Sequence, residues 1–294
     1  MFRVSGFGFR AGTAHAGGRL LNPQPETRNP QRGFTLVEMI VVIVITGIIA
    51  AAVAMFIKRP VEGYIDLARR AELTDIADTA LRRMARDLRL ALPNSIRTTD
   101  ASQTVELLLT RTGGRYRVEP KADGTGDILD FSASDGSFDI VGPALTLANG
   151  DRIAIYNLGP NVPDADAYQS ANITPYAGAA GSVGNVAITP FKFPLASPGN
   201  RFQVVEGPVS YACSGGTLWR YWGYAIQPAQ PSAAALPGLA NVQSAKLATR
   251  LTACAITYVE GVTERSGLVT LQLTLAQDGE SVTLLHEVHV SNVP

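Results

Sequence analysis

The chain has 294 residues, with 25 basic and 25 acidic side chains, which is long enough for one or two domains with a sizeable core. Balanced charge excludes a general polyanion binder, which needs a concentrated basic surface, so nucleic acid is not an expected partner. The content of Gly, Pro, Ser and Thr, together with short β-type runs, favours a secreted or surface β-rich domain over a cytosolic helical enzyme.

The first predicted element is an apolar helix over residues 34–59. The uncharged run Met39–Ile57 would span about 28 Å at 1.5 Å per helical residue, close to the thickness of a bilayer core. Five arginines precede the run and favour an N-terminus left in the cytoplasm. A signal peptide cut near Ala52 is the alternative, although its apolar stretch is usually shorter. Neither a plain membrane anchor nor a signal peptide explains Glu38, because a carboxylate at membrane depth costs about 2.5–3.5 kcal/mol.

The stretch Gly33-Phe34-Thr35-Leu36-Val37-Glu38 resembles the processing site of type IV pilins and type II secretion pseudopilins. The resemblance implies that residues 1–33 are a leader peptide, that a prepilin peptidase cuts between Gly33 and Phe34, and that Phe34 is then N-methylated. It also implies that Glu38 meets the N-terminal ammonium of a neighbouring subunit, which would make a buried carboxylate tolerable. A residue snorkelling to the membrane interface is the alternative. The leader is long for this family, so either it is long here or the assigned start lies upstream of the true one.

Residues 60–93 are predicted to form the amphipathic half of the same long helix. Pro60 and Gly63 predict a kink or short break, and Pro93-Asn94 predicts the end. Charged residues between the apolar positions predict a solvated or subunit-facing surface, with a nucleic-acid stripe of arginines as the alternative. Steps of three and four define the apolar stripe: Leu73, Ile76, Ala80, Leu81, Met84, Leu88 and Leu92.

Residues 94–294 are predicted to form a β-rich head, because the apolar period changes to two and turn residues bound each run. Asp278-Gly279 predicts a hairpin turn between the last two strands. Residues 158–200 and 226–241 are predicted to be loops. The predicted strands are Val105–Thr110, Tyr116–Val118, Ile128–Phe131, Arg152–Asn157, Phe202–Val205, Val209–Cys213, Thr217–Tyr221, Ala253–Val259, Leu268–Ala276 and Ser281–Val290.

The two cysteines, Cys213 and Cys254, both follow the apolar segment and lie in predicted strands. If that segment delivers the head out of the cytoplasm, an oxidising compartment favours a disulfide between them. Two unpaired buried thiols are the alternative.

Few other residues suggest chemistry. Asp123, Asp127 and Asp130 have the acidic, glycine-bent look of a calcium loop but lack the full twelve-residue pattern, so a polar turn is the default and no other cofactor is expected. His286 and His289 would point to opposite faces of a strand, which argues against a metal site. No catalytic constellation is evident, which predicts a protein that is not an enzyme.

An aromatic cluster lies in "TLWRYWGY". On a strand, Trp219 and Tyr221 would face one way, with Trp222 and Tyr224 on the other side. One set is predicted to fill the core beneath the helix. The other set either packs as well or forms a sugar-stacking or partner-binding surface.

Beyond the leader, the segments 59–97, 201–213 and 267–294 resemble minor pilins of the mannose-sensitive haemagglutinin (MSHA) pilus system, and more loosely J-type pseudopilins. This resemblance implies an α+β pilin-like fold, a single-pass anchor in the bacterial inner membrane, a periplasmic head and later a place on the pilus surface. The implied partners are other pilins, the prepilin peptidase and the inner-membrane assembly platform. A J-type pseudopilin of type II secretion and a membrane-anchored adhesin or DNA-binding pilin are the alternatives.

Overall fold

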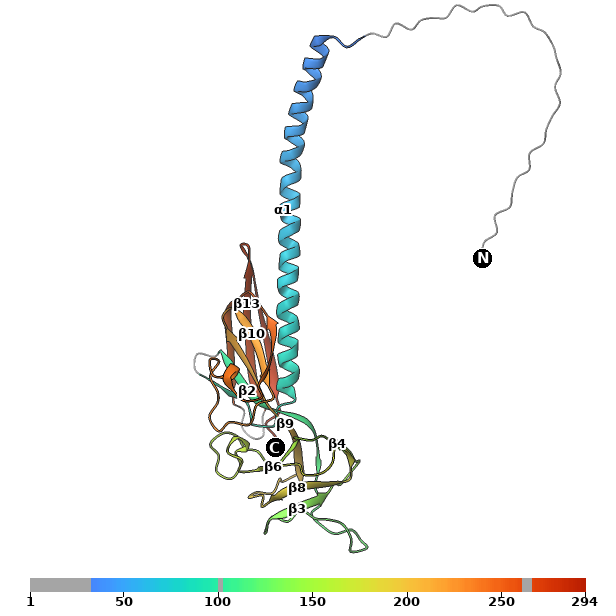
Figure 1. The fold of residues 1–294 in the computed structure, drawn as a ribbon, viewed down its shortest axis with the longest axis vertical. Coiled ribbons are helices and arrows are strands. Elements are labelled where there is room, and N and C mark those ends of the chain that lie inside the picture. Colours follow the sequence, from blue (N-terminus) through green and yellow to red (C-terminus); the bar gives the residue numbers. More distant parts are fainter. Residues whose placement is uncertain (1–32, 100–102, 261–265) are drawn as a thin grey trace, which may run out of the picture. The chain divides into compact units, whose positions relative to one another are not determined.

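A computed structural model describes residues 33–99, 103–260 and 266–294 (Figure 1). The predicted leader, apart from Gly33, lies outside the described residues. The described residues divide into two units, one that ends at residue 59 and one that comprises residues 60–294, and the second contains all the strands that the structure describes.

Helix α1 runs from Leu36 to Arg89. Its helical assignment is continuous through Pro60, so the expected short break is wrong, because a proline removes one backbone donor without ending the remaining ladder. The helix ends four residues before Pro93, since the backbone N–H of Leu92 donates to Leu108 O (2.7 Å) on the first long strand.

The head contains two main antiparallel sheets (Figure 1). The larger has the order β1-β2-β9-β10-β11, with β5 and β6 joined to it through β9. The smaller has the order β12-β13-β14. The bounds in the larger sheet are Arg97–Thr98 for β1, Thr104–Arg115 for β2, Arg152–Ala154 for β5, Ile173–Pro175 for β6, Arg201–Ser214 for β9, Thr217–Trp222 for β10 and Gln243–Ala248 for β11; those in the smaller are Leu251–Val259 for β12, Gly267–Gln277 for β13 and Glu280–Val290 for β14.

The main core lies between the second half of α1 and these two sheets. Most of the predicted apolar stripe is buried there, which confirms the amphipathic reading of this half of the helix. The helical members, Leu73, Ala77, Ala80, Leu81, Met84, Ala85 and Leu88, meet residues of both sheets, including Val105, Tyr211, Leu218, Ile256, Leu271 and Val288.

The predicted hairpin is confirmed. Strands β13 and β14 pair continuously, and Asp278-Gly279 forms the turn with positive φ at both residues, +48° and +88°. The second glycine pair of the head, Gly215-Gly216, also turns a hairpin, between β9 and β10. Gly113-Gly114 does not: both residues lie inside β2, opposite Gln203 and Phe202.

The largest difference from the prediction concerns residues 158–200, which were expected to be a loop and instead contain regular structure. They contain β6, β7 (Gly181–Val183), β8 (Asn185–Phe191) and the 3-10 turn η2 (Ala167–Gln169). Strand β8 pairs with β3 (Asp135–Asp139), and β7 pairs with β4 (Leu145–Leu147). These strands enclose a second core whose members include Tyr116, Phe138, Val186, Phe193 and Phe202.

Other strand boundaries shift as well. The two predicted strands Phe202–Val205 and Val209–Cys213 are one strand, β9, that crosses a bulge. The predicted strand Ile128–Phe131 is absent, and β11 was not predicted. Residues 226–241 contain no strand, as expected, but include the 3-10 turn η3 (Leu236–Gly238).

Candidate functional site

The segment that resembles a pilin processing site begins with non-helical residues. Gly33, Phe34 and Thr35 precede α1, so the bond between Gly33 and Phe34 lies outside the helical hydrogen-bond ladder. A peptidase could therefore reach it without unwinding the helix. Cleavage and methylation at this bond remain predictions.

Thr35 caps the helix. Its Oγ1 accepts a hydrogen bond from the backbone N–H of Glu38 (3.2 Å), and its carbonyl accepts one from Met39 N (3.2 Å). The Thr-x-x-Glu spacing is that of a capping box, and an acid in the first turn interacts favourably with the helix dipole. Glu38 thus has a local reason to lie at this position in addition to the assembly role that the resemblance implies.

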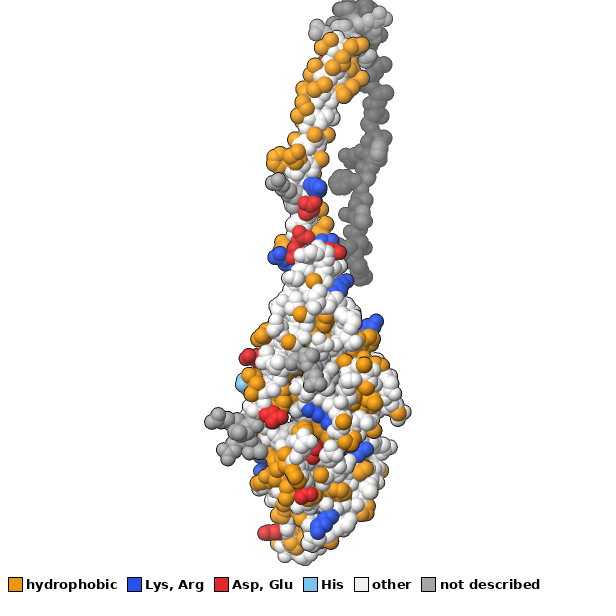
Figure 2. Space-filling view, turned by 90° about the vertical axis from the view of Figure 1, so that its left-hand side faces the viewer, with side chains coloured by type: hydrophobic (Ala, Val, Ile, Leu, Met, Phe, Trp, Pro, Cys, Tyr) orange, Lys and Arg blue, Asp and Glu red, His pale blue; other side chains and the backbone are white. Residues whose placement is uncertain are grey.

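Every described residue from 33 to 58 is exposed. Figure 2 shows hydrophobic side chains gathered on this part of the helix. Among the described residues, α1 is the one helix long and apolar enough to cross a membrane. The hydroxyl of Thr46 donates to Val42 O (2.7 Å), so this polar group is satisfied within the helix. An apolar surface of this extent requires lipid or other apolar helices as its surroundings.

A buried polar cluster fixes the other end of α1 to the head. Asp87 is buried, and its Oδ2 accepts hydrogen bonds from Tyr211 Oη (2.8 Å) and Arg220 Nε (2.8 Å). Burial, reinforced by Asp87, raises the pKa of Tyr211 far above its usual range, so the phenol keeps its proton and donates.

This burial corrects the expectation that Asp87 belongs to the charged surface. Its position three residues after Met84 and seven after Ala80 places it on the apolar face, and that spacing was the available signal.

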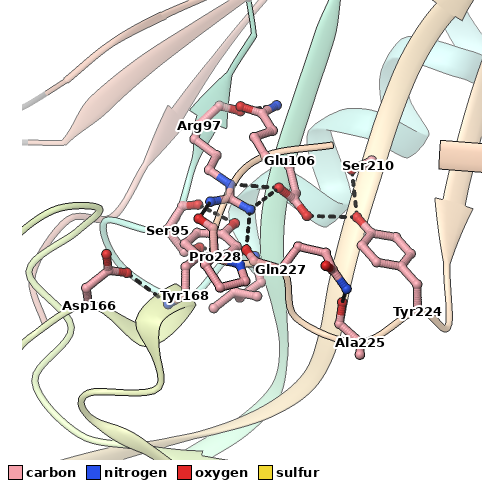
Figure 3. A network of polar contacts seen from close by, with 12 residues as sticks. Ser95, Arg97, Glu106, Asp166, Tyr168, Ser210, Tyr224, Ala225, Gln227 and Pro228 are labelled. Carbon is pink, nitrogen blue, oxygen red and sulfur yellow. Dashed lines mark hydrogen bonds and ion pairs between the residues drawn. The ribbon is translucent and has the colours of Figure 1, made fainter. Parts of the chain in front are cut away.

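A second buried cluster surrounds Glu106 (Figure 3). Arg97 Nε and Nη2 lie 2.7 Å from Glu106 Oε2, and Tyr224 Oη donates to Oε1 (2.9 Å). Arg97 also donates to the carbonyls of Gln227 and Pro228 (2.8 Å each) and covers the ring of Tyr168. The cluster joins the neighbouring strands β1 and β2 to two regions that are distant from them in sequence, Tyr168 and residues 224–228, so its arrangement indicates a structural clamp.

The structure contains the predicted disulfide, Cys213–Cys254. Cys213 lies in β9 and Cys254 in β12, so the bond joins the two main sheets that share the helix core. The closed loop spans a sequence separation of 41 residues.

The three candidate calcium residues each accept hydrogen bonds from different partners. Asp123 accepts from Thr125, Asp130 from Ser132, and Asp127 Oδ2 from Ser137 Oγ (2.6 Å). Within residues 33–99, 103–260 and 266–294, no group of three or more His, Cys, Asp or Glu side chains is placed to hold a metal ion. These contacts match the default polar turn, and calcium binding stays a prediction.

The expected arrangement of the aromatic cluster is confirmed for Trp219 with Tyr221 and wrong for Trp222 with Tyr224. Trp219 stacks on Tyr221 (6.2 Å between centroids), and Tyr224 packs beside Tyr221 rather than beside Trp222. The reason is that β10 ends at Trp222 and Gly223, with φ +84°, turns the chain. Trp222 packs against the helix core from the other face.

Comparison with protein families gives one match, to the family described as the prokaryotic N-terminal methylation motif, over residues 28–54. The match supports a type IV pilin or pseudopilin, whose members are structural subunits, with prepilin peptidase processing and filament partners in general terms. No curated protein and no solved structure matches the chain.

Proposed function

We propose that this chain is a minor pilin of a type IV pilus of the MSHA kind, similar to MshO. A prepilin peptidase cleaves it between Gly33 and Phe34 and methylates Phe34. The mature chain is held in the bacterial inner membrane by a single span, with its head in the periplasm. The assembly platform then moves it into a filament among other pilins, and the head reaches the cell surface.

The observation that carries this proposal is the fully exposed apolar half of α1, most of which lies within the matched motif at residues 28–54. Lipid tails and a bundle of apolar helices are similar surroundings for Ile, Val and Leu, so exchange between them costs little hydrophobic free energy. The exchange of lipid for apolar helices therefore has little preference of its own for the filament. Glu38 supplies that preference, because a carboxylate in apolar surroundings requires a cationic partner. In this mechanism the apolar half is buried in lipid before assembly and among other pilins afterwards, and the chain itself makes or breaks no covalent bond.

A J-type pseudopilin of a type II secretion system is the second candidate, since the motif is common to pilins and pseudopilins. The resemblance of residues 59–97 to MSHA minor pilins favours the pilus. Deleting the chain would separate them: loss of surface pili supports the first, and loss of protein export supports the second.

The test is N-terminal mass spectrometry of the protein from its native membrane, with and without the prepilin peptidase. A peptide that begins at N-methylated Phe34 and disappears without the peptidase is the expected result. An intact leader in both strains, or cleavage near Ala52, would refute the pilin assignment.

A further inference from the structure

We propose that the head carries a binding site for a neutral sugar, in a two-lobed cleft beside the bulge of β9. Two adjoining hollows of about 260 and 340 Å³ share five lining residues, Gly150, Glu206, Gly207, Pro208 and Gly223. Together they have the size of a small-ligand site. All of the residues lie in the head, so the site does not depend on how the N-terminus is processed.

The backbone creates the cleft. The pairing of β2 with β9 shifts register around Thr110, which opens the sheet there. Gly150, Gly207 and Gly223 have positive φ (+90°, +149° and +84°), and a Cβ at Gly150 or Gly207 would meet no atom within 4 Å. The rim therefore includes three positions without side chains, which leaves room for a ligand.

The polar groups of the first lobe are held in place before any ligand binds. Arg111 lies between two carboxylates, with Nε 3.3 Å from Asp151 Oδ2 and Nη2 3.3 Å from Glu206 Oε1. Asp151 is buried and also accepts from Ala148 N (2.7 Å). Such fixed side chains lose little entropy on binding.

Arg220 provides the donors of this lobe. Its side chain is 10% exposed, lines the cleft, and donates from Nε to Asp87. Bonds to Asp87 and Tyr211 use part of its five N–H groups and leave the other terminal N–H groups for a ligand. Glu206 provides the acceptor: its side chain is 38% exposed, its ion pair with Arg111 uses Oε1, and it lines both lobes.

The balance of charge selects the ligand class. Asp151 and Glu206 would repel an anion, and Arg111, Arg220 and, in the second lobe, Arg152 would repel a cation. With Asp87, which pairs with Arg220, acidic and basic groups are equal in number. A hydroxyl donates and accepts at once, so a polyhydroxylated ring can accept from Arg220 and donate to Glu206. Trp222 and Pro208 supply apolar wall for the C–H face of such a ring.

The chain's two tryptophans make a direct test, because Trp222 lines the cleft and Trp219 faces the other side of β10. The full chain, in a detergent without a sugar headgroup, is titrated with glucose, galactose, mannose and N-acetylglucosamine. In Trp219→Phe, where Trp222 is the reporter, at least one sugar should change the fluorescence saturably. In Trp222→Phe the change should be absent.

Glu206→Gln in the Trp219→Phe background should weaken binding about tenfold. Glu287→Gln, on the exposed face of β14, should leave it unaltered.

Three outcomes would overturn the proposal. One is no saturable change with any of the four sugars while circular dichroism shows a folded head. Another is an equal change in Trp222→Phe, which would place the response elsewhere. The third is tighter binding of sulfate or choline than of every sugar. None of these results bears on N-terminal processing, so this site and the pilin assignment can fail separately.

Discussion

The two halves of α1 are both helical and rich in apolar residues, yet only one of them is used by the head. In the first half every side chain through residue 58 is exposed, and apolar residues surround the helix. In the second half the apolar residues form one stripe that the two sheets cover. Two methionines show the difference between the halves: Met55 is 74% exposed and Met84 is 0% exposed. The first half therefore depends on surroundings outside the chain, and the second half on the chain's own fold.

The largest expected effect comes from Glu38, the charge at the start of the first half. Under the proposed function, Glu38→Val should nearly abolish incorporation into filaments, because the subunit loses its ionic partner while its apolar surface is retained. Sheared filaments and membranes are compared by immunoblot. Thr46→Val is the matched control, since that hydroxyl is already satisfied within the helix. Normal incorporation of Glu38→Val would remove Glu38 from the assembly mechanism.

A buried charge in the second half should matter for folding instead. Asp87→Asn removes the charge that pairs with Arg220, and breaking a buried pair costs about 3–5 kcal/mol. The melting temperature of the head, followed by near-UV circular dichroism, should fall clearly. Asp75→Asn, an exposed acid of the same helix, should change stability by less than about 0.5 kcal/mol. Equal effects of the two variants would contradict the described environment of Asp87.

The two methionines test the comparison directly. Met84→Ala opens a cavity in the helix core and should cost about 2–5 kcal/mol of unfolding free energy. Met55→Ala removes the same atoms from an exposed position and should leave head unfolding unaltered. A similar loss in both variants would mean that the first half also contributes to the stability of the head.

The disulfide should stabilise the head by about 2–4 kcal/mol, because it closes a loop of some 40 residues and joins the sheets on which the second half of α1 packs. The double variant Cys213→Ala with Cys254→Ala should melt at a lower temperature than the oxidised protein. A reductant should lower the melting temperature of the original chain and have no effect on the variant. Insensitivity of both to reductant would show that the bond is not formed.

Sequence alone predicted the features that repeat a short pattern. The stripe of α1 and the alternation Val269, Leu271, Leu273, Leu275 each repeat over many residues, and both are buried as expected. The second core was not predicted because its strands are short, such as Leu145–Leu147 and Gly181–Val183, and their pairing partners are distant in sequence. The cleft beside Glu206 was also missed, since it depends on a register shift that no local pattern encodes.

The smallest expected effect tests the buried polar groups by pH. Burial raises the pKa of Glu106 above 4.5, against the opposing influence of Arg97 and the hydrogen bond from Tyr224. The folded state therefore holds this proton more tightly than the unfolded chain. The contribution of Glu106 to stability is fully present below pH 4.5 and is lost as pH rises through the raised, folded-state pKa. Glu106→Gln removes this proton, so the melting temperature of the original chain minus that of the variant should fall as pH rises from about 4 to 7. The same difference for Glu287→Gln, an exposed acid on β14, should stay flat. A difference for Glu106→Gln that rises with pH would mean that Arg97 outweighs burial and that the clamp holds a fully ionised pair.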